Sequence, residues 1–352
     1  MIAWPTGEEL ARFAATLAVG TAGGGLFALL GAPAPWLTGA VAATAGVSLA
    51  GVKLGMPPWL RAVAFVFLGA NMGATVTPET IVLMWRWPLG LLGLALCIAA
   101  IMGSVAFYLE RVHGFDRATA RLAAIPGNVG YVMALAAEIP CDAARLTIIQ
   151  MMRLGAMVLL MPMLLVVTGI APASQAVPRG PAAHPVVPLE LVLLLAAGVI
   201  GGLAFKRLRL PAPQLFGAML AAALLYGSGA FTTGMPGWML APAFVVTGSM
   251  VGTNFAGMDL KLLRATLLAS IGNVLIGSGV ALLFAGPVAT LLGLPVAQLW
   301  LAYAPGGVET MAVMALAMGF DAAFVGTHHA VRFVLLGIYV PVFVKRLARS
   351  RT

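Results

Sequence analysis

Two arginines, Arg153 and Arg332, stand in the middle of long apolar runs. A guanidinium at the centre of a membrane costs several kcal/mol of free energy unless it is paired or faces water. Two chemistries fit such a position, and the sequence leaves both open. Each arginine can form a structural ion pair, with Glu309 or Asp321 as its partner, or it can bind an anionic solute.

A Pro-Gly pair interrupts the apolar run that precedes each arginine, in the segments PGNVGYV (126–132) and PGGVETM (305–311). A helix that restarts at membrane depth directs free backbone N–H groups and a positive dipole end into the protein. Two such starts are a recurring way to build an anion or solute site near the middle of a membrane. The alternative is that Pro-Gly only shapes a packed kink. The candidate solute-binding residues are Pro126, Gly127, Asn128, Gln150, Arg153, Pro305, Gly306, Gly307, Glu309, His328, His329 and Arg332.

The carboxylates near these segments also have structural explanations. Glu309 falls in the first turn of the second short helix, where a negative charge stabilises the helix N-terminus. Its counterpart after the first break is Gly130. Asp142 and Asp321 directly precede long helices predicted at 143–162 and 322–341, which is the position of an N-cap. We interpret these two aspartates as caps or ion-pair partners.

The histidines and cysteines show no metal-binding spacing. Neighbouring helical residues such as His328 and His329 point about 100° apart, so they do not chelate one metal ion. Proton coupling through a histidine stays open. Cys97 and Cys141 form no CxxC pair, and we expect both to be reduced thiols. Because no Ser-His-Asp order and no nucleotide-binding loop occurs either, we expect no cofactor, no metal site and no enzyme activity.

The composition shows which kind of element must position these residues. Hydrophobic residues make up 61% of the 352 residues and charged residues only 9%, whereas a soluble domain carries about 25% charged residues. Apolar runs recur from end to end, which predicts an all-α integral membrane protein whose partner is the lipid bilayer. This excludes a soluble enzyme and a DNA-binding module. Membrane orientation explains the net charge of +9, so no nucleic-acid partner is expected.

Two halves of the chain repeat each other at a shift of 178 or 179 positions. Matching stretches are PAPWLTGA (33–40) with PAPQLFGA (211–218), Gly69 and Gly73 with Gly248 and Gly252, LAAIPG (122–127) with LAYAPG (301–306), and Arg153 with Arg332. Shared apolar composition alone would not align Pro, Gly and Arg. The chain therefore divides into a first membrane repeat at 1–170, a Pro/Ala-rich linker at 171–188 and a second membrane repeat at 189–352.

Basic residues lie in opposite loops of the two halves. The loop 110–121 holds three arginines and its counterpart 289–300 holds none, whereas the basic segment 206–209 matches the uncharged segment 28–31. The positive-inside rule then predicts inverted halves with both termini cytoplasmic. Inverted halves need an odd number of crossings, so one of the six apolar segments in each half must fold back. We expect about five transmembrane helices plus one re-entrant or broken helix per half, at 118–138 and 297–318. Twelve crossings in a parallel repeat are the alternative.

The duplicated PAP segments and the stretch 305–332 resemble the AbrB family of bacterial inner-membrane proteins, which is known for an internal duplication. The resemblance implies a multi-pass protein of the bacterial inner membrane. The first half departs from the family's PGG-x-x-E pattern, because Gly130 stands where the carboxylate would be. Members of the family are named either as regulators of gene expression or as proposed ammonia monooxygenases.

These observations favour a secondary transporter or permease for a small anionic solute. The alternative is a membrane-embedded regulator that acts indirectly on gene expression, because no cytoplasmic loop is long enough to be an effector domain. A monooxygenase is disfavoured, since it would need a copper or iron site. The sequence does not decide whether the chain forms a homo-oligomer.

Overall fold

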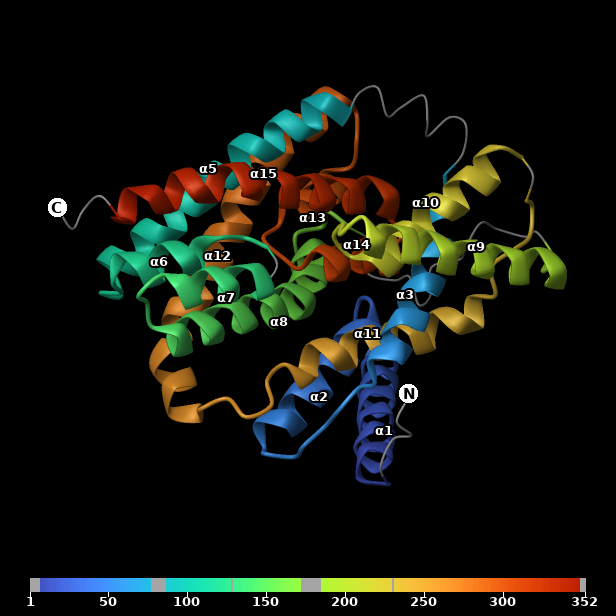
Figure 1. Cartoon of the computed structure of the whole chain (residues 1–352), viewed down its shortest axis with the longest axis horizontal. Helices are drawn as coiled ribbons and strands as arrows, with labels where there is room; N and C mark the ends of the chain where they lie inside the picture. Colours follow the sequence, from blue (N-terminus) through green and yellow to red (C-terminus); the bar gives the residue numbers. More distant parts are fainter. Residues whose placement is uncertain (1–6, 77–86, 128, 172–184, 230, 349–352) are drawn as a thin grey trace. The chain divides into compact units, whose positions relative to one another are not determined.

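The computed structural model of the chain describes residues 7–76, 87–127, 129–171, 185–229 and 231–348 (Figure 1). All regular structure in these residues is helical, which confirms the predicted all-α class. Asn128 and most of the predicted linker 171–188 lie outside the described residues.

Six of the described helices are long and apolar enough to cross a membrane, by length and composition. A crossing needs about 20 apolar residues, and the apolar lengths of these helices run from 20 to 33 residues. They are α1 (Gly7–Leu29), α5 (Trp87–Arg111), α8 (Ala143–Val167), α9 (Pro188–Arg207), α12 (Leu260–Leu292) and α15 (Ala322–Ala348). Helices of 14 to 16 residues lie between them, namely α2 (Pro35–Leu49), α3 (Pro58–Gly73), α10 (Pro213–Gly227) and α11 (Leu240–Thr253).

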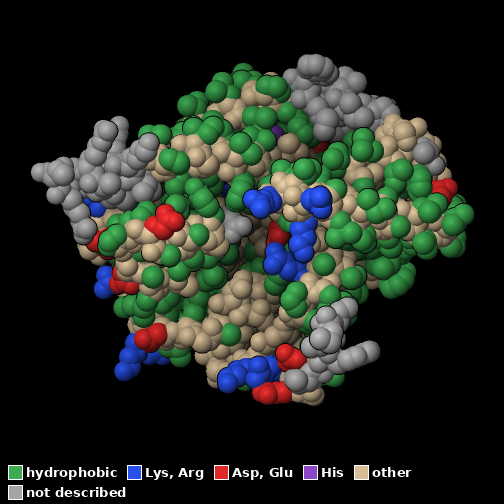
Figure 2. All heavy atoms as spheres, in the orientation of Figure 1, with side chains coloured by type: hydrophobic (Ala, Val, Ile, Leu, Met, Phe, Trp, Pro, Cys, Tyr) green, Lys and Arg blue, Asp and Glu red, His purple; other side chains and the backbone are tan. Residues whose placement is uncertain are grey.

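Much of the surface is apolar. The side chains of Leu268, Leu283 and Leu291 are 71%, 70% and 72% exposed. Figure 2 shows hydrophobic side chains over most of the visible face, with charged side chains in smaller groups. Because soluble proteins rarely expose large contiguous apolar surfaces, this surface fits contact with lipid.

The described helices form two compact units. Unit 1 comprises Met1–Leu83, Val158–Gly257 and Val313–Ala323. Unit 2 comprises Met84–Met157, Met258–Ala312 and Phe324–Thr352. Each unit takes segments from both halves of the sequence, so the division at 171–188 stays a prediction from the sequence.

Close helix crossings at glycine hold unit 1 together. A Cβ atom on Gly23 of α1 would lie 2.3 Å from the carbonyl oxygen of Gly39 in α2. The same contact recurs between α9 and α10, where a Cβ on Gly201 would lie 2.3 Å from the carbonyl oxygen of Gly217. Only glycine lets two backbones approach this closely, and such crossings replace the hydrophobic driving force that is missing in lipid.

The glycines that the repeat pairs at positions 69 and 248 form two further crossings in unit 1. A Cβ on Gly69 of α3 would lie 2.1 Å from the carbonyl oxygen of Leu215 in α10. A Cβ on Gly248 of α11 would lie 2.5 Å from the carbonyl oxygen of Leu37 in α2. The contacts α3–α10 and α11–α2 therefore join helices from the two halves of the sequence.

The duplicated PAP segments share one backbone feature. Ala34 (φ 48°) and Ala212 (φ 46°) both adopt the left-handed conformation immediately before the first turn of α2 and α10. This conformation is uncommon for a residue with a Cβ atom. The proline that follows each alanine begins the helix, where a missing N–H group costs nothing.

Unit 2 contains the first broken segment and the second as far as Ala312. In the first, α6 (Arg117–Ala124) ends before Pro126 and α7 (Val129–Glu138) follows it. In the second, α13 (Val296–Tyr303) ends before Pro305 and α14 (Val308–Ala317) begins after it. Both helices after the breaks have 10 residues, which is too short to span a membrane, as the sequence predicted. Within the unit, α12 packs against α5 and α13.

Candidate functional site

The first break lies between α6 and α7. It leaves carbonyl groups at the end of α6 without hydrogen-bond partners in their own helix. The last four carbonyls of a helix have no partner within that helix, and Pro126 prevents α6 from continuing. Residues 122–127 are buried. Their carbonyl oxygens therefore need donors from other helices, because water is scarce at this depth.

Gln150 and Arg153 of α8 supply these donors. Arg153 donates from Nη1 to the carbonyl oxygen of Ala123 at 3.1 Å, and from Nη2 to Oε1 of Gln150. Gln150 donates from Nε2 to the carbonyl oxygens of Leu122 at 3.2 Å and Ile125 at 3.5 Å. Both side chains are at most 1% exposed. The two residues thus hold the first break to α8.

The second break has the same arrangement with one different side chain. Arg332 of α15 donates from Nη1 to the carbonyl oxygen of Ala304 at 2.7 Å and from Nη2 to that of Gly306 at 2.5 Å. Nε2 of His329 bonds to the carbonyl oxygen of Leu301 at 2.9 Å. His329 matches Gln150 at a shift of 179 positions, and Leu301 matches Leu122. The same backbone contact is therefore made by glutamine at one break and by histidine at the other.

Each break lies beside the arginine helix of the other half. A Cβ atom on Gly127 at the first break would lie 2.8 Å from Cδ1 of Leu336 in α15. A Cβ on Gly307 at the second break would lie 3.3 Å from Cδ2 of Leu154 in α8. Each break thus bonds to the arginine helix of its own half and packs against the arginine helix of the other half.

The site carries positive charge. The four hydrogen bonds described above for the two guanidinium groups go to neutral oxygens. Within the same residues, no hydrogen-bond partner faces Nε of Arg153 or Nε of Arg332. Both arginines are 1% exposed. An anion at this site would be attracted by both charges and would find N–H donors that are not yet used.

The carboxylates occupy helix starts. Glu309 is half-buried in the first turn of α14, where it stabilises the helix N-terminus. Asp321 lies directly before α15. Asp142 caps α8, because its Oδ1 accepts a hydrogen bond from the backbone N–H of Arg145 at 3.0 Å. Its Oδ2 also lies 3.2 Å from Nε of Arg145.

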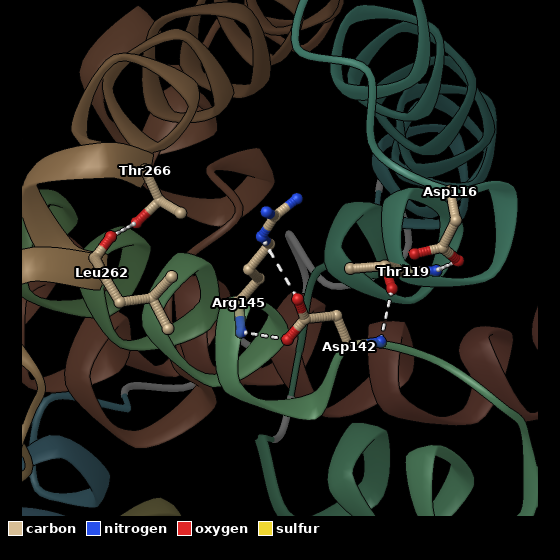
Figure 3. A network of polar contacts seen from close by, with 6 residues as sticks. All are labelled: Asp116, Thr119, Asp142, Arg145, Leu262 and Thr266. Atoms are coloured by element: carbon tan, nitrogen blue, oxygen red, sulfur yellow. Dashed lines mark hydrogen bonds and ion pairs between the residues drawn. The ribbon is translucent and has the colours of Figure 1, made fainter.

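A polar network ties the start of α6 to the start of α8 (Figure 3). Oδ1 of Asp116 accepts from the backbone N–H of Thr119 at 2.9 Å and so caps α6. Oγ1 of Thr119 in turn accepts from the backbone N–H of Asp142 at 2.8 Å. The chain therefore leaves α7 at the same end at which it entered α6.

His328 lies among aromatic rings that no sequence pattern marks. Its Nδ1 lies 2.9 Å from the carbonyl oxygen of Phe324, so Nδ1 carries the proton of this bond. The ring of Phe324 lies 4.0 Å away, and those of Trp87 and Tyr303 lie 6.3 Å away. Tyr303 donates its hydroxyl to the carbonyl oxygen of Gly90 at 2.6 Å. An aromatic residue in an apolar run is too common to mark such a cluster in advance.

The structure therefore brings together most of the predicted site residues. Within the part of the chain that it describes, no group of three His, Cys, Asp or Glu side chains is arranged to hold a metal ion. Asn128 falls outside that part. Gln150, Arg153, His329 and Arg332 bond to the two breaks, and their chemistry is that of hydrogen-bond donors and positive charge.

The sequence of this chain matches the profile of a known family and is similar to two proteins of that kind. The profile of a family described as "Transition state regulatory protein AbrB" matches residues 2–81 and 36–348. The uncharacterized protein YhjN of Bacillus subtilis (strain 168) is 26% identical, over 97% of this chain and 94% of its own. A candidate regulator named AbrB from Escherichia coli (strain K12) is also 26% identical, over 91% of this chain and 92% of its own.

Proposed function

The chain belongs to the AbrB family, and we propose that it is a secondary transporter or permease that carries a small anionic solute across the bacterial inner membrane. One observation carries the proposal. Two buried arginines donate hydrogen bonds to neutral oxygens at two helix breaks that pack against each other's arginine helices.

Holding the breaks in place does not require charge. Gln150 and His329 also bond to carbonyl oxygens at the breaks, and the amide of Gln150 does so without any charge. A guanidinium in the same place adds a charge whose burial is costly. An anionic solute that binds there offsets this cost, which is a physical reason for arginine at both positions.

We further propose the topology that the loop charges favour. Each half crosses the membrane five times, which counts the helices of 14 to 16 residues as crossings beside the six long ones. Each half also contributes one re-entrant segment, the halves are inverted, and both termini are cytoplasmic. The bond between Asp142 and Thr119 supports a segment 118–138 that returns to the side from which it came. The 10-residue lengths of α7 and α14 support the same reading at both breaks. Solute sites of inverted-repeat transporters lie at such broken helices.

Thermal unfolding of the detergent-purified protein tests the anion site. A panel of small carboxylic acids, amino acids and inorganic anions is added to the wild type, Arg153→Gln and Arg332→Gln. A ligand at 100 times its Kd stabilises the folded state by about 2.7 kcal/mol and so raises Tm. We expect one class of anion to raise Tm of the wild type and to leave both variants unchanged.

Arg145→Gln is the matched control, because Arg145 lies on the same helix as Arg153 but is partly exposed and paired with Asp142. It should keep the response of the wild type. If no anion raises Tm of any of these proteins, the proposed site is wrong.

The name of the Escherichia coli relative supports a second candidate function, an indirect role in gene regulation. Such a role would act through a partner protein or through the solute itself. A transcriptional response that persists in Arg332→Gln would favour regulation through a partner, whereas a response that is lost would favour regulation through the solute.

A further inference from the structure

One face of α12 carries polar and small residues in its first half. Thr266, Ser270, Asn273 and Gly277 follow one another at steps of four, three and four residues, so they share one side of the helix. All four are buried. We call them the α12 polar face.

The opposite side of α12 has a different character. Leu268, Ile271 and Leu275 are 71%, 44% and 57% exposed. They carry only apolar side chains, as contact with lipid requires. The polar residues therefore lie on the protein side of α12, where a dry interior would favour apolar packing.

Two groups on the α12 polar face lack partners. Among the described residues, neither Nδ2 of Asn273 nor Oγ of Ser270 has a hydrogen-bond partner, and both residues are 1% exposed. Oγ1 of Thr266 donates to the carbonyl oxygen of Leu262 at 2.8 Å (Figure 3). Buried polar groups in native proteins nearly always bond to protein or to water. Water along this face would satisfy both groups.

The α12 polar face connects a charged end of the helix to the second break. The helix begins after Asp259, which caps it, and Lys261 and Arg264 are exposed in its first turns. At the other end of the face, a Cβ atom on Gly277 would lie 2.9 Å from Cγ of Pro305. The distance along the helix from Thr266 to Gly277 is about 16 Å.

The matching helix of the first half lacks this face. At a shift of 179 positions, Leu94 and Ile98 of α5 stand where α12 has Asn273 and Gly277. Leu94 and Ile98 are at most 1% exposed, so this part of α5 is an ordinary apolar contact. The duplicated fold therefore does not require polar residues here, and their presence on α12 alone needs its own explanation.

We propose that the α12 polar face lines a path that fills with water when it opens, and by which a small hydrophilic anion reaches the second break from one side of the membrane. This inference rests on the proposed transport function and names the route to its site. In the proposed topology the basic end of α12 is cytoplasmic, so the path opens to the cytoplasm.

Cysteine accessibility tests the path without knowledge of the solute. Ser270→Cys and Asn273→Cys are made in a variant whose two native cysteines are alanine, and folding is checked by gel filtration. Inside-out membrane vesicles are treated with 2-sulfonatoethyl methanethiosulfonate, a small anionic reagent. Lys261→Cys marks full accessibility, and Leu268→Cys and Leu275→Cys mark the lipid side.

We expect both path cysteines to react at least roughly 10-fold faster than the lipid-side cysteines, because a thiol in an apolar environment is not ionised. Leu94→Cys and Ile98→Cys on α5 should be as slow as the lipid-side positions. Unreactive Ser270→Cys and Asn273→Cys beside a reactive Lys261→Cys would overturn the path. Equal reactivity at Leu94→Cys and Asn273→Cys would overturn it as well.

The result of the cysteine experiment is independent of the result of the unfolding experiment on the anion site. Reactive path cysteines together with an anion response that survives Arg332→Gln would keep the path and reject the arginine site. Unreactive path cysteines together with an anion response that Arg332→Gln abolishes would keep the site and reject this route to it.

Discussion

Replacing Gln150 by leucine should weaken the first break. In the structure Gln150 donates to the carbonyl oxygens of Leu122 and Ile125 and accepts from Arg153, and it is fully buried. Leucine has a similar volume but cannot make any of these three bonds. The variant therefore removes hydrogen bonding with little change in packing.

The expected loss follows from the three bonds. A side-chain hydrogen bond in a membrane protein contributes about 0.6 kcal/mol on average and about 1.7 kcal/mol at most. Three bonds give a loss of roughly 2 kcal/mol, rising to about 5 kcal/mol if each is at the upper value. We expect the upper part of this range, because Arg153 is a charged group that loses a buried partner.

Gln150→His should cost less than Gln150→Leu. At the second break His329 makes the matching bond, to the carbonyl oxygen of Leu301 at 2.9 Å. Chemical or thermal unfolding in detergent measures both losses, and Thr147→Val at a half-buried position of α8 serves as the control. The reasoning is refuted if Gln150→Leu unfolds like the wild type, or if histidine is as damaging as leucine.

Three further predictions concern the scaffold and the topology. Ala34→Gly should raise Tm, because glycine relieves a left-handed alanine at a gain of roughly 1 kcal/mol. Gly69→Ala should destabilise by about 1–3 kcal/mol, since its Cβ would lie 2.1 Å from a backbone oxygen, whereas Gly25→Ala, which meets nothing within 4 Å, should not; unfolding curves compare the two. Partial burial, and to a smaller extent the carboxylates of Asp116 and Asp142, raises the pKa of the Cys141 thiol above 9.0. Labelling of Cys141 by maleimide should therefore be slow at pH 7, speed up as the pH rises towards the raised pKa, and occur from the cytoplasmic side.

The labelling of Cys141 tests the re-entrant segment 118–138 directly. Cys141 follows α7, so a re-entrant segment keeps it on the side where α6 begins, whereas a segment that crosses would expose it on the opposite side. Labelling of intact spheroplasts with a membrane-impermeant maleimide at pH 8.5 would contradict the proposed topology. Cys97 is fully buried and should stay silent in either case.

The breaks could be predicted from the sequence because they have a local cause, and the close crossings have an equally local cause. Pro126 and Pro305 cannot continue a helix, and the chain breaks at both. Glycine at positions 69 and 248 leaves room for a neighbouring backbone, and another helix fills that room at both.

Nothing in the sequence indicated which groups the two arginines bond to. The sequence left an ion pair or a solute open for Arg153 and Arg332, and the structure shows bonds to backbone carbonyls. Every residue has a carbonyl group, so no residue type marks which one a guanidinium will meet. The match of Gln150 with His329 was visible in the sequence, but their shared role appears only when both are seen bonded to the same backbone position.

Direct binding of an anion to the purified protein tests the central claim. With the anion that raises Tm most, calorimetric titration would compare the wild type, Arg153→Gln, Arg332→Gln and Arg145→Gln. Hydrogen bonds to charged groups contribute about 1.5–3 kcal/mol, so each buried variant should bind roughly 10- to 150-fold more weakly. Arg145→Gln should bind like the wild type. Unchanged affinity in Arg153→Gln and Arg332→Gln would contradict an anion site built on the two buried arginines.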